Sequence, residues 1–380
     1  MDHSNFTWIS PYDPSDGRGG WKAMQFHLLR ALEAKLGPAR RIAPVEIPEE
    51  LFGKWISRGQ KKLGIPRRYT YYSDARLAAF GEAVSSQLPK NGNQPVVFFG
   101  PLPFVKCRPH GSYYIYTDGA FFIHYWEYNQ DHSHSRNDIA RITEAEAEFM
   151  RHAARVWCSS QKVADRVTRE YRLAPGQAMF VGTGPGNVPL PVATAHYENY
   201  LVLIGADFER KGGRLAVESV AEARKLGADI TIKFIGAKPP ADVLVLPFVE
   251  WCGWLDMKKE SDRNRFAEVM SGAGAQILLS RHDLTPLAIA EASVYSKATM
   301  AAAVGGIPEM IRDERTGWLI GPEATAKEIG GRVASLFLEP NALALAGEAA
   351  FDFYATGWNW ETVATRCISS MRTRNPGLPD

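Results

Sequence analysis

The residues best suited to chemistry lie at positions 275–319, where two carboxylates follow an apolar run of strand length. Asp283 falls in the polar loop after this run, and Glu291 falls in a helix expected to begin near Pro286. The pair Gly305–Gly306 comes later, directly before another short helical pattern. A carboxylate can bind sugar hydroxyls, and the backbone N–H groups at a helix start can bind phosphate. Together these groups are what a nucleotide-sugar site requires.

A second candidate site follows the apolar run at Leu201–Ile204. The loop after it carries Arg210, Lys211 and the pair Gly212–Gly213, where a helical pattern begins. Cations beside a helix N-terminus can bind an anion such as a diphosphate. A solvated, charged turn is the alternative. Ligands of open α/β sheets bind at the carboxyl ends of strands, so the position of this loop favours the anion site.

Gly17, Gly19 and Gly20 form a third group, in a loop between a predicted strand and an amphipathic helix. Glycines at such a turn let the backbone approach a ligand closely. Their spacing is not the GxGxxG of dinucleotide sites, so that class of site is disfavoured. Taken alone, these glycines are better explained by a tight turn that needs positive φ.

The elements that must position these groups alternate along the chain, which predicts an α/β fold with parallel sheets. The predicted strands are Phe6–Ile9, Val96–Phe99, Tyr113–Tyr116, Val156–Cys158, Met179–Val181, Leu201–Ile204, Ile230–Ile235, Ile277–Leu279 and Ala298–Ala302. The predicted helices are Trp21–Leu36, Asp74–Leu88, Ile139–Ala154, Lys162–Tyr171, Gly213–Leu226, Arg263–Met270 and Ala324–Leu338. Residues 184–199 are rich in glycine and proline, so we interpret them as a linker with the domain boundary near residue 190.

The chain of 380 residues is long enough for two domains. Its net charge of +2 does not point to nucleic acid. The four cysteines are scattered, so we interpret them as reduced thiols of a cytoplasmic protein. No apolar run reaches the roughly 18 residues of a membrane-spanning helix. Aromatic residues at positions 113–128, interpreted as exposed, are the one indication of peripheral membrane contact.

In order and spacing, the groups of the second half resemble retaining family-4 glycosyltransferases, the glycosyl transferases group 1, which have the GT-B fold. The matching residues are Ser280, Asp283, Glu291, Ala292, Gly305, Gly306, Ile307, Pro308, Glu309, Gly317, Trp318 and Leu319. A weaker resemblance covers the first half, through Gly19–Gly20 and positions 158–160 and 184–187. Positions 356–372 resemble the C-terminal helix that crosses back onto the first domain in this fold.

The resemblance implies two Rossmann-like, doubly wound domains facing each other across a cleft. Residues 1–190, with the crossing helix at 357–373, would form the acceptor-binding domain. Residues 191–356 would form the donor-binding domain.

The resemblance also implies roles in binding the donor. Lys211 matches the lysine that contacts the donor diphosphate. Glu291 matches the acid that binds the ribose hydroxyls, and Asp283 takes the position of the acid that touches the transferred sugar. The backbone of Leu284–Thr285 would face the phosphates, and the Gly19–Gly20 loop would approach the diphosphate from the other domain.

Three positions depart from the family pattern. Asp283 replaces a glutamate, so its side chain is one methylene shorter. Ala206 stands where the family has an arginine, and Arg210 is the candidate to supply that charge. Thr285–Pro286 replaces Phe-Gly. A degenerate nucleotide-sugar binding protein therefore stays open as an alternative, as does a GT-B nucleotide-sugar epimerase, although no base for an epimerase is identified.

The acceptor residues are expected after the predicted strand at Tyr113–Tyr116. Asp118 could orient the acceptor hydroxyl as a catalytic residue beside Lys211 and Asp283, and a capping role explains it equally well. His124, Tyr125, Trp126 and Glu127 would line the acceptor side, where an aromatic ring can stack on a sugar.

A metal cluster is the alternative for His132, His134, Asp131 and Asp138, but a polar loop explains these residues better. The chain also has no Asp-x-Asp, the metal–diphosphate ligand of the other glycosyltransferase fold. We therefore expect no metal or other cofactor. The expected reaction is the metal-independent, retaining transfer of a sugar from a nucleotide diphosphate sugar to a glycan, a lipid-linked acceptor or another hydroxyl, in polysaccharide biosynthesis.

Overall fold

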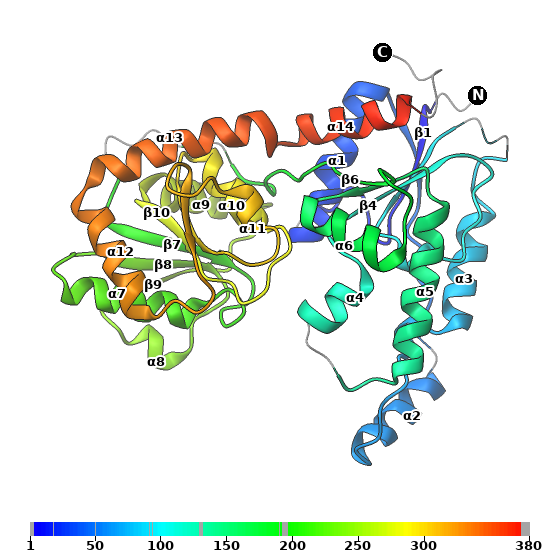
Figure 1. The fold of residues 1–380 in the computed structure, drawn as a ribbon, viewed down its shortest axis with the longest axis horizontal. Coiled ribbons are helices and arrows are strands. Elements are labelled where there is room, and N and C mark those ends of the chain that lie inside the picture. The colour runs from blue at the N-terminus through cyan, green and yellow to red at the C-terminus, as the bar shows by residue number, and fades with distance from the viewer. Residues whose placement is uncertain are drawn as a thin grey trace. The chain divides into compact units, whose positions relative to one another are not determined.

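The structure is a computed structural model that describes residues 4–17, 19–49, 51–90, 92, 94–128, 132–189, 191 and 197–373. The chain divides into two compact units (Figure 1). The first unit consists of Met1–Asp16, Gln25–Gly182 and Ala364–Asp380. The second consists of Gly17–Met24 and Thr183–Val363.

The first unit is built on a six-stranded sheet with the order β2-β1-β3-β4-β5-β6, in which all neighbours are parallel. The strands are β1 (Phe6–Ile9), β2 (Ala39–Ile42), β3 (Val96–Phe99), β4 (Tyr113–Thr117), β5 (Arg155–Cys158) and β6 (Ala178–Phe180). After β1 the chain adds β2 on one side and β3 on the other. The loops after β1 and β3 therefore separate at a topological switch point, the usual ligand position of such sheets.

Helices and short helical turns surround this first sheet. They are α1 (Gly20–Leu36), α2 (Leu51–Lys62), η1 (Thr70–Tyr72), α3 (Asp74–Ser85), η2 (Leu102–Phe104), α4 (Phe121–Ile123), the π-helical turn η3 (His124–Tyr128), α5 (Arg136–His152) and α6 (Gln161–Tyr171). Serine hydroxyls cap two of them: Ser73 accepts from the Arg76 N–H, and Ser160 accepts from the Val163 N–H. Helix α14 (Trp360–Arg372) ends in this unit, where the Trp157 indole donates to Ser370 Oγ at 2.8 Å.

The second unit has the sheet order β12-β11-β10-β7-β8-β9, again with parallel neighbours throughout. The strands are β7 (Tyr200–Gly205), β8 (Thr231–Gly236), β9 (Val249–Gly253), β10 (Ala275–Leu278), β11 (Thr299–Ala302) and β12 (Gly317–Ile320). The chain runs outward from β7 to β9, then returns to the other side of β7 with β10. The switch point of this sheet therefore lies between the carboxyl ends of β7 and β10.

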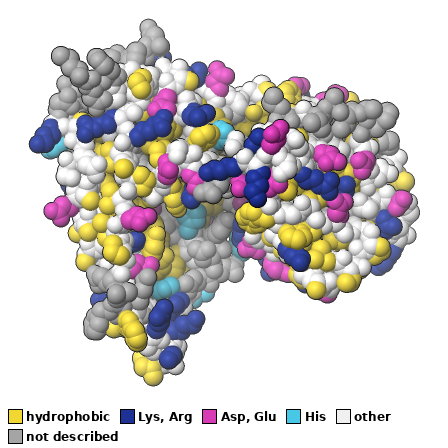
Figure 2. Space-filling view, turned by 180° about the vertical axis from the view of Figure 1, so that it is seen from behind, with side chains coloured by type: hydrophobic (Ala, Val, Ile, Leu, Met, Phe, Trp, Pro, Cys, Tyr) yellow, Lys and Arg dark blue, Asp and Glu magenta, His cyan; other side chains and the backbone are white. Residues whose placement is uncertain are grey.

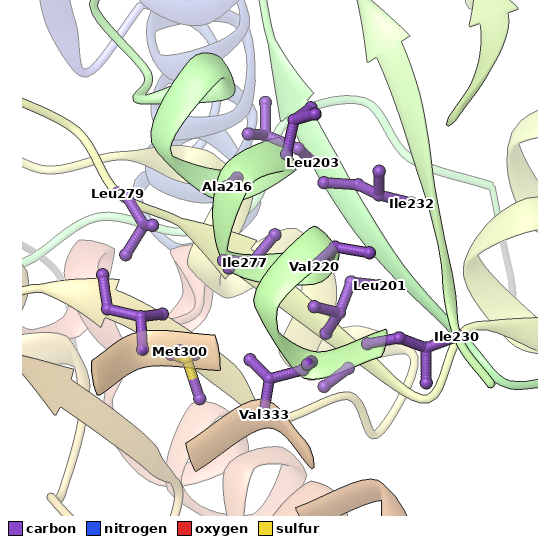
Figure 3. Packing of buried hydrophobic residues seen from close by; sticks show 14 of the residues in the cluster. Leu201, Leu203, Ala216, Val220, Ile230, Ile232, Ile277, Leu279, Met300 and Val333 are labelled. Atoms are coloured by element: carbon purple, nitrogen blue, oxygen red, sulfur yellow. The ribbon is translucent and has the colours of Figure 1, made fainter. Parts of the chain in front are cut away.

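Two layers of helices bury the second sheet. They are α7 (Gly213–Lys225), α8 (Ala241–Leu244), α9 (Glu260–Gly272), α10 (Leu287–Val294), α11 (Ile307–Met310), α12 (Ala326–Leu338) and α13 (Pro340–Gly357). Leu201 and Leu203 of β7 pack with Val220 of α7 and Val333 of α12 (Figure 3). Tyr200 and Val202, which alternate with them along β7, pack with residues of α9 and α10 instead. This alternation buries both faces of the strand, as expected for a parallel sheet.

The predicted parallel α/β architecture is confirmed, and each predicted strand and helix has a counterpart in the structure. The sequence analysis did not predict α2, α13 or the strands β2, β9 and β12. Part of the predicted linker, residues 190 and 192–196, lies outside the described residues.

The expectation that positions 113–128 expose aromatic rings is wrong for most of the segment. Tyr113–Tyr116, Phe121 and Tyr125 are buried, because β4 lies inside the sheet and the next turns pack on α5. Among the described aromatic residues of this segment, Trp126 is exposed, at 38%, and Phe122 is partly buried. No described helix is long and apolar enough to span a membrane. Basic and acidic side chains are intermixed on the face shown in Figure 2.

Gly305 is the glycine at which the fold leaves least room. Its φ is +54°, and an added Cβ would lie 1.6 Å from the carbonyl oxygen of Asp283. We predict that Gly305→Ala lowers the free energy of unfolding of the second unit by about 2 kcal/mol or more, through strain and the forced shift of this loop. Urea unfolding measures the change. The control is Gly331→Ala on α12, where a Cβ meets no described atom within 4 Å. Equal stability of the two variants would contradict the prediction.

Candidate functional site

A buried ion pair joins the loops that follow β7 and β10. Lys211 Nζ lies 2.5 Å from Asp283 Oδ2, and the exposed fractions of the two residues are 8% and 7%. Ser280 Oγ donates to the same carboxylate oxygen at 3.1 Å. A buried ion pair is tolerated only when further hydrogen bonds compensate the lost hydration, as the serine does here. The pair therefore marks the switch point of the second sheet as a polar site inside the fold.

Arg210 adds a second cation beside this pair. Its Nη1 lies 3.7 Å from Asp283 Oδ2 and donates to the His282 carbonyl oxygen at 3.2 Å. The Arg281 N–H donates to the Arg210 carbonyl oxygen at 2.9 Å, which ties the two loops together. Arg210 thus brings positive charge to the loop that contains Ala206, as the sequence analysis expected.

Two glycines allow the loops to meet closely. Gly212 has φ +73°, and a Cβ there would lie 2.0 Å from the Leu279 carbonyl oxygen. Gly305 touches the Asp283 backbone, and the Gly306 N–H donates to the Leu284 carbonyl oxygen at 2.8 Å. The pair Gly305–Gly306 therefore packs directly against the loop after β10.

Leu284 and Thr285 lie just before α10, whose N-cap residue is Pro286. Thr285 is buried and Leu284 is partly exposed. The helix that was expected to begin near Pro286 begins at Leu287, which confirms the prediction.

Glu291 lies on α10 and faces the segment that leads into the second unit. Its Oε1 accepts from the Gly186 N–H at 3.2 Å, and a Cβ on Gly186 would lie 2.4 Å from that oxygen. The Trp360 indole holds this segment by donating to the Pro185 carbonyl oxygen at 2.7 Å. Glu291 keeps some exposed surface, but desolvation still raises its pKa to about 7, although the Gly186 N–H and the Lys211 charge act in the opposite direction. The structure thus brings Lys211, Asp283 and Glu291 into one electrostatic neighbourhood.

Gly19 and Gly20 lie at the start of α1, in a segment grouped with the second unit. Gly19 has φ +69°, so the turn needs a glycine there. A Cβ on either residue would meet no described atom within 4 Å, so both backbones are open to close approach.

In the first unit, Asp118 follows β4 and pairs with His124. Asp118 Oδ1 lies 3.4 Å from His124 Nε2. Burial alone would lower the pKa of His124, but the hydrogen bond and charge of Asp118, with the charge of Glu146, outweigh it and raise the pKa above its ordinary value. Asp118 and His124, both predicted to act on the acceptor, therefore form a charged pair at the carboxyl edge of the first sheet.

Glu146 is a buried acid that the sequence analysis missed. It is 1% exposed, and it accepts from the Phe121 N–H at 2.7 Å and from the Tyr171 hydroxyl. Burial raises its pKa to about 7, against the lowering effect of these hydrogen bonds and of His124. Nothing in the sequence around it, TEAEAEF, separates this glutamate from its solvated neighbours.

Trp126 and Glu127 belong to the same π-helical turn as His124 but have different surroundings. Trp126 is exposed, and its ring stacks on His132 with centroids 5.1 Å apart. Glu127 forms an ion pair with Arg166 of α6, with Oε1 2.5 Å from Nη2. The turn therefore does not gather its predicted acceptor residues at one point.

The residues of the metal alternative have other partners. His134 contacts the Tyr69 ring, and Asp138 accepts from the Tyr69 N–H at 2.9 Å. Asp131 lies outside the described residues. Within the described ranges, no three His, Cys, Asp or Glu side chains are grouped as metal ligands would be.

Comparison with known proteins finds one family model that matches part of the chain. Residues 198–337 match the model of the family described as Glycosyl transferases group 1. The matched region contains β7 to β12 and hence the whole Lys211–Asp283–Glu291 group. No curated protein sequence matches the chain.

Solved structures with a similar fold include three that cover most of this chain. Sucrose-phosphate synthase from Thermosynechococcus elongatus has 16% identity and a TM-score of 0.68, covering 97% of this chain and 98% of its own. HepE from Anabaena in complex with UDP has 12% identity and a TM-score of 0.65, covering 97% and 100%. TarM from S. aureus has 13% identity and a TM-score of 0.59, and the match covers 77% of this chain but 58% of TarM.

At these identities the structural likeness establishes the fold alone, which is the predicted GT-B fold. The family match over the second unit supports a glycosyltransferase that uses a nucleotide sugar.

The raised pKa of Glu291 predicts how stability depends on pH. The folded unit holds the Glu291 proton more tightly than the unfolded chain does. The contribution of Glu291 to the free energy of unfolding is therefore complete below about pH 4.5 and is lost as the pH rises toward 7. In Glu291→Gln this loss is absent. Between pH 5 and 8 we expect the free energy of unfolding of the variant to rise by about 2 kcal/mol relative to that of the wild type. Urea unfolding of both proteins measures this difference. Glu146 remains in both proteins and its contribution cancels. Parallel pH curves would rule out the shift.

Proposed function

We propose that this chain is a retaining glycosyltransferase that moves a sugar from a nucleotide diphosphate sugar to a hydroxyl acceptor. The observation that carries the proposal is the Lys211–Asp283 pair with Glu291 nearby, at the switch point of a sheet that matches Glycosyl transferases group 1. These are the residue types and positions that the family pattern assigns to the donor.

The unused hydrogen-bonding groups of the site suit such a donor. Asp283 meets Lys211, Ser280 and Arg210 through Oδ2 only, and its Oδ1 has no partner among the described residues. We propose that Oδ1 accepts from a hydroxyl of the transferred sugar. Lys211 donates one N–H to Asp283, which leaves further ammonium donors for the diphosphate. The shorter side chain of Asp283 is thus compatible with both contacts.

Glu291 would bind the ribose. Its Oε1 holds the Gly186 N–H, and its Oε2 has no partner among the described residues. A ribose diol donates hydrogen bonds to carboxylates, so binding would favour the ionised form of Glu291. UDP is the first nucleotide to test, because HepE was solved with UDP and with UDP and glucose.

The proposed reaction breaks the bond between the sugar C1 and the diphosphate oxygen. Lys211, Arg210 and backbone N–H groups of the loops would stabilise the charge that develops on the leaving diphosphate. The acceptor hydroxyl attacks C1 from the face that the diphosphate leaves, and its proton passes to the leaving phosphate oxygen. This route retains the anomeric configuration and needs no covalent nucleophile. Asp118, paired with His124, would orient the acceptor.

The acceptor would be a glycan or a lipid-linked sugar met in the cytoplasm at a membrane surface. Trp55, Leu63 and Ile65, on and just after α2, are strongly exposed, with Trp55 at 71% and Leu63 at 74%. Basic residues Arg58 and Lys61–Lys62 lie in the same helix. Exposed apolar and basic side chains together favour contact with an anionic membrane surface. The membrane contact is therefore proposed at α2, not at positions 113–128.

A degenerate nucleotide-sugar binding protein is the second candidate. Its support is the replacement of the family arginine by Ala206 and of the family glutamate by Asp283. Turnover separates the two candidates, since a binding protein would be stabilised by nucleotide and release no sugar.

Lys211→Met should lower the rate of sugar transfer or donor hydrolysis by roughly 10²–10³-fold, because the diphosphate loses its closest cation. Since removing one partner of a buried pair is destabilising, the double variant Lys211→Met/Asp283→Asn is made as well. It should recover the melting temperature but not the rate. The matched control is Arg214→Ala, which removes an exposed cation bound to Asp242. A rate within a factor of two of wild type for Lys211→Met would remove the residue from the diphosphate role.

The proposal also requires chemistry without a metal ion, since Lys211 and Arg210 carry the charge that a metal would otherwise carry. Turnover should persist after dialysis against EDTA, assayed as release of the nucleoside diphosphate. Loss of activity that Mn²⁺ or Mg²⁺ restores would contradict metal independence.

A further inference from the structure

The first unit holds a pocket of about 390 Å³, and no residue that lines it has so far been assigned a role in donor binding. Its size is within the range of small-molecule sites. The residues that line it are Ser57, Arg67, Arg68, Tyr69, Thr70, Tyr71, Tyr125 and His134. Tyr125 is the one of these residues that was singled out from the sequence as part of an acceptor site.

The walls of this pocket are held in place by contacts between distant segments. The Arg67 N–H donates to the Ser133 carbonyl oxygen at 2.8 Å, and the Ser135 N–H donates to the Arg67 carbonyl oxygen at 2.7 Å. The Tyr69 and His134 rings have centroids 4.6 Å apart. These contacts fix the backbone that carries both arginines, so the pocket is preformed.

The lining is basic, aromatic and rich in hydroxyl groups. Arg68 is exposed, and its guanidinium forms no hydrogen bond or ion pair with the described residues. Arg67 contributes a second guanidinium, which donates to Ser133 Oγ. No lining residue is a carboxylate. A guanidinium binds carboxylate or phosphate through two N–H groups, and an exposed ring such as Tyr71 can stack on a sugar.

The pocket adjoins the proposed acceptor residues of the same unit, because its lining residue Tyr125 lies between His124 and Trp126 in η3. Burial raises the pKa of Tyr12, and the nearby Tyr71 and Asp118 raise it further, so these side chains are within electrostatic reach of one another. Tyr12 follows β1, and Asp118 follows β4. Tyr71 therefore connects the pocket to the carboxyl edge of the first sheet, where Asp118 and His124 pair.

We propose that this pocket binds the acceptor by a phosphate or carboxylate group on its sugar, with Arg68 as the main ligand of the anion and Tyr71 as the stacking ring. The inference rests on the proposed function, because it names the class of acceptor that the glycosyltransferase would use. It narrows that class from any hydroxyl compound to anionic saccharides.

Isothermal titration of the full chain with four probes tests this proposal. The probes are glucose 6-phosphate, glucuronic acid, glucose and inorganic phosphate. We expect at least one anionic sugar to bind 10-fold or more tightly than both glucose and inorganic phosphate, and the better of the two identifies phosphate or carboxylate as the group recognised. Equal affinity for glucose and both anionic sugars would overturn the proposal, as would inorganic phosphate binding as tightly as the sugars.

Two variants and a control place the binding in the pocket. Arg68→Ala should reduce the affinity for the preferred anionic sugar about 10-fold. Tyr71→Ala should reduce the affinity for that sugar without changing the affinity for inorganic phosphate. Arg169→Ala removes an exposed arginine of α6 that does not line the pocket, and should leave the affinity for every probe unchanged. An unchanged preference in Arg68→Ala would show that the anion binds elsewhere and would overturn the assignment. Melting temperatures confirm that each variant is folded.

Nucleotide binding in the same samples separates this inference from the proposed function. If UDP or another nucleoside diphosphate binds and the anionic sugars do not, the pocket assignment is wrong and the donor site stands. If the sugars bind with the expected dependence on Arg68 and no nucleotide binds, the pocket stands and the proposed transfer is wrong.

Discussion

The buried ion pair between Lys211 and Asp283 is the interaction on which the second unit depends. Two opposite charges out of water are each costly, and they are stable together only because Ser280 and Arg210 complete the surroundings of the shared oxygen. The pair connects the loops after β7 and β10, where the strand order reverses. At this point the two loops diverge, and fixed charges lie beside accessible backbone groups. An anionic donor requires such a combination.

The same architecture occurs twice with different side chains. In the second unit the switch-point loops carry cations and paired acids, whereas the first unit presents the Asp118–His124 pair beside an aromatic, arginine-lined pocket. Such a division suits a reaction between a diphosphate donor and an acceptor recognised by an arginine and a stacking ring. The fold supplies the positions, and the loop residues decide the chemistry.

Much of the fold could be predicted because buried parallel strands leave continuous apolar runs, as at β3, β4 and β7. The edge strand β2 has the sequence ARRI with two exposed arginines, so it lacks the apolar run that identifies the buried strands. The proposed donor site could be predicted because its residues follow strand ends in an order that resembles the family pattern. Glu146 could not be predicted, because only tertiary packing decides which of several neighbouring glutamates is buried. The pocket of Arg67 and Arg68 could not be predicted either, because it forms through contacts between segments far apart in the sequence.

The most direct test of this account is a thermal-shift screen with UDP, GDP, ADP, CMP and dTDP, repeated with Glu291→Ala. A ligand that binds only the folded state raises the melting temperature, by an amount that grows with its concentration relative to the dissociation constant. The account predicts a clear, concentration-dependent rise with one nucleoside diphosphate and its loss in the variant. No rise with any of them, or an equal rise in wild type and variant, would contradict a nucleotide-sugar site at the switch point of the second sheet.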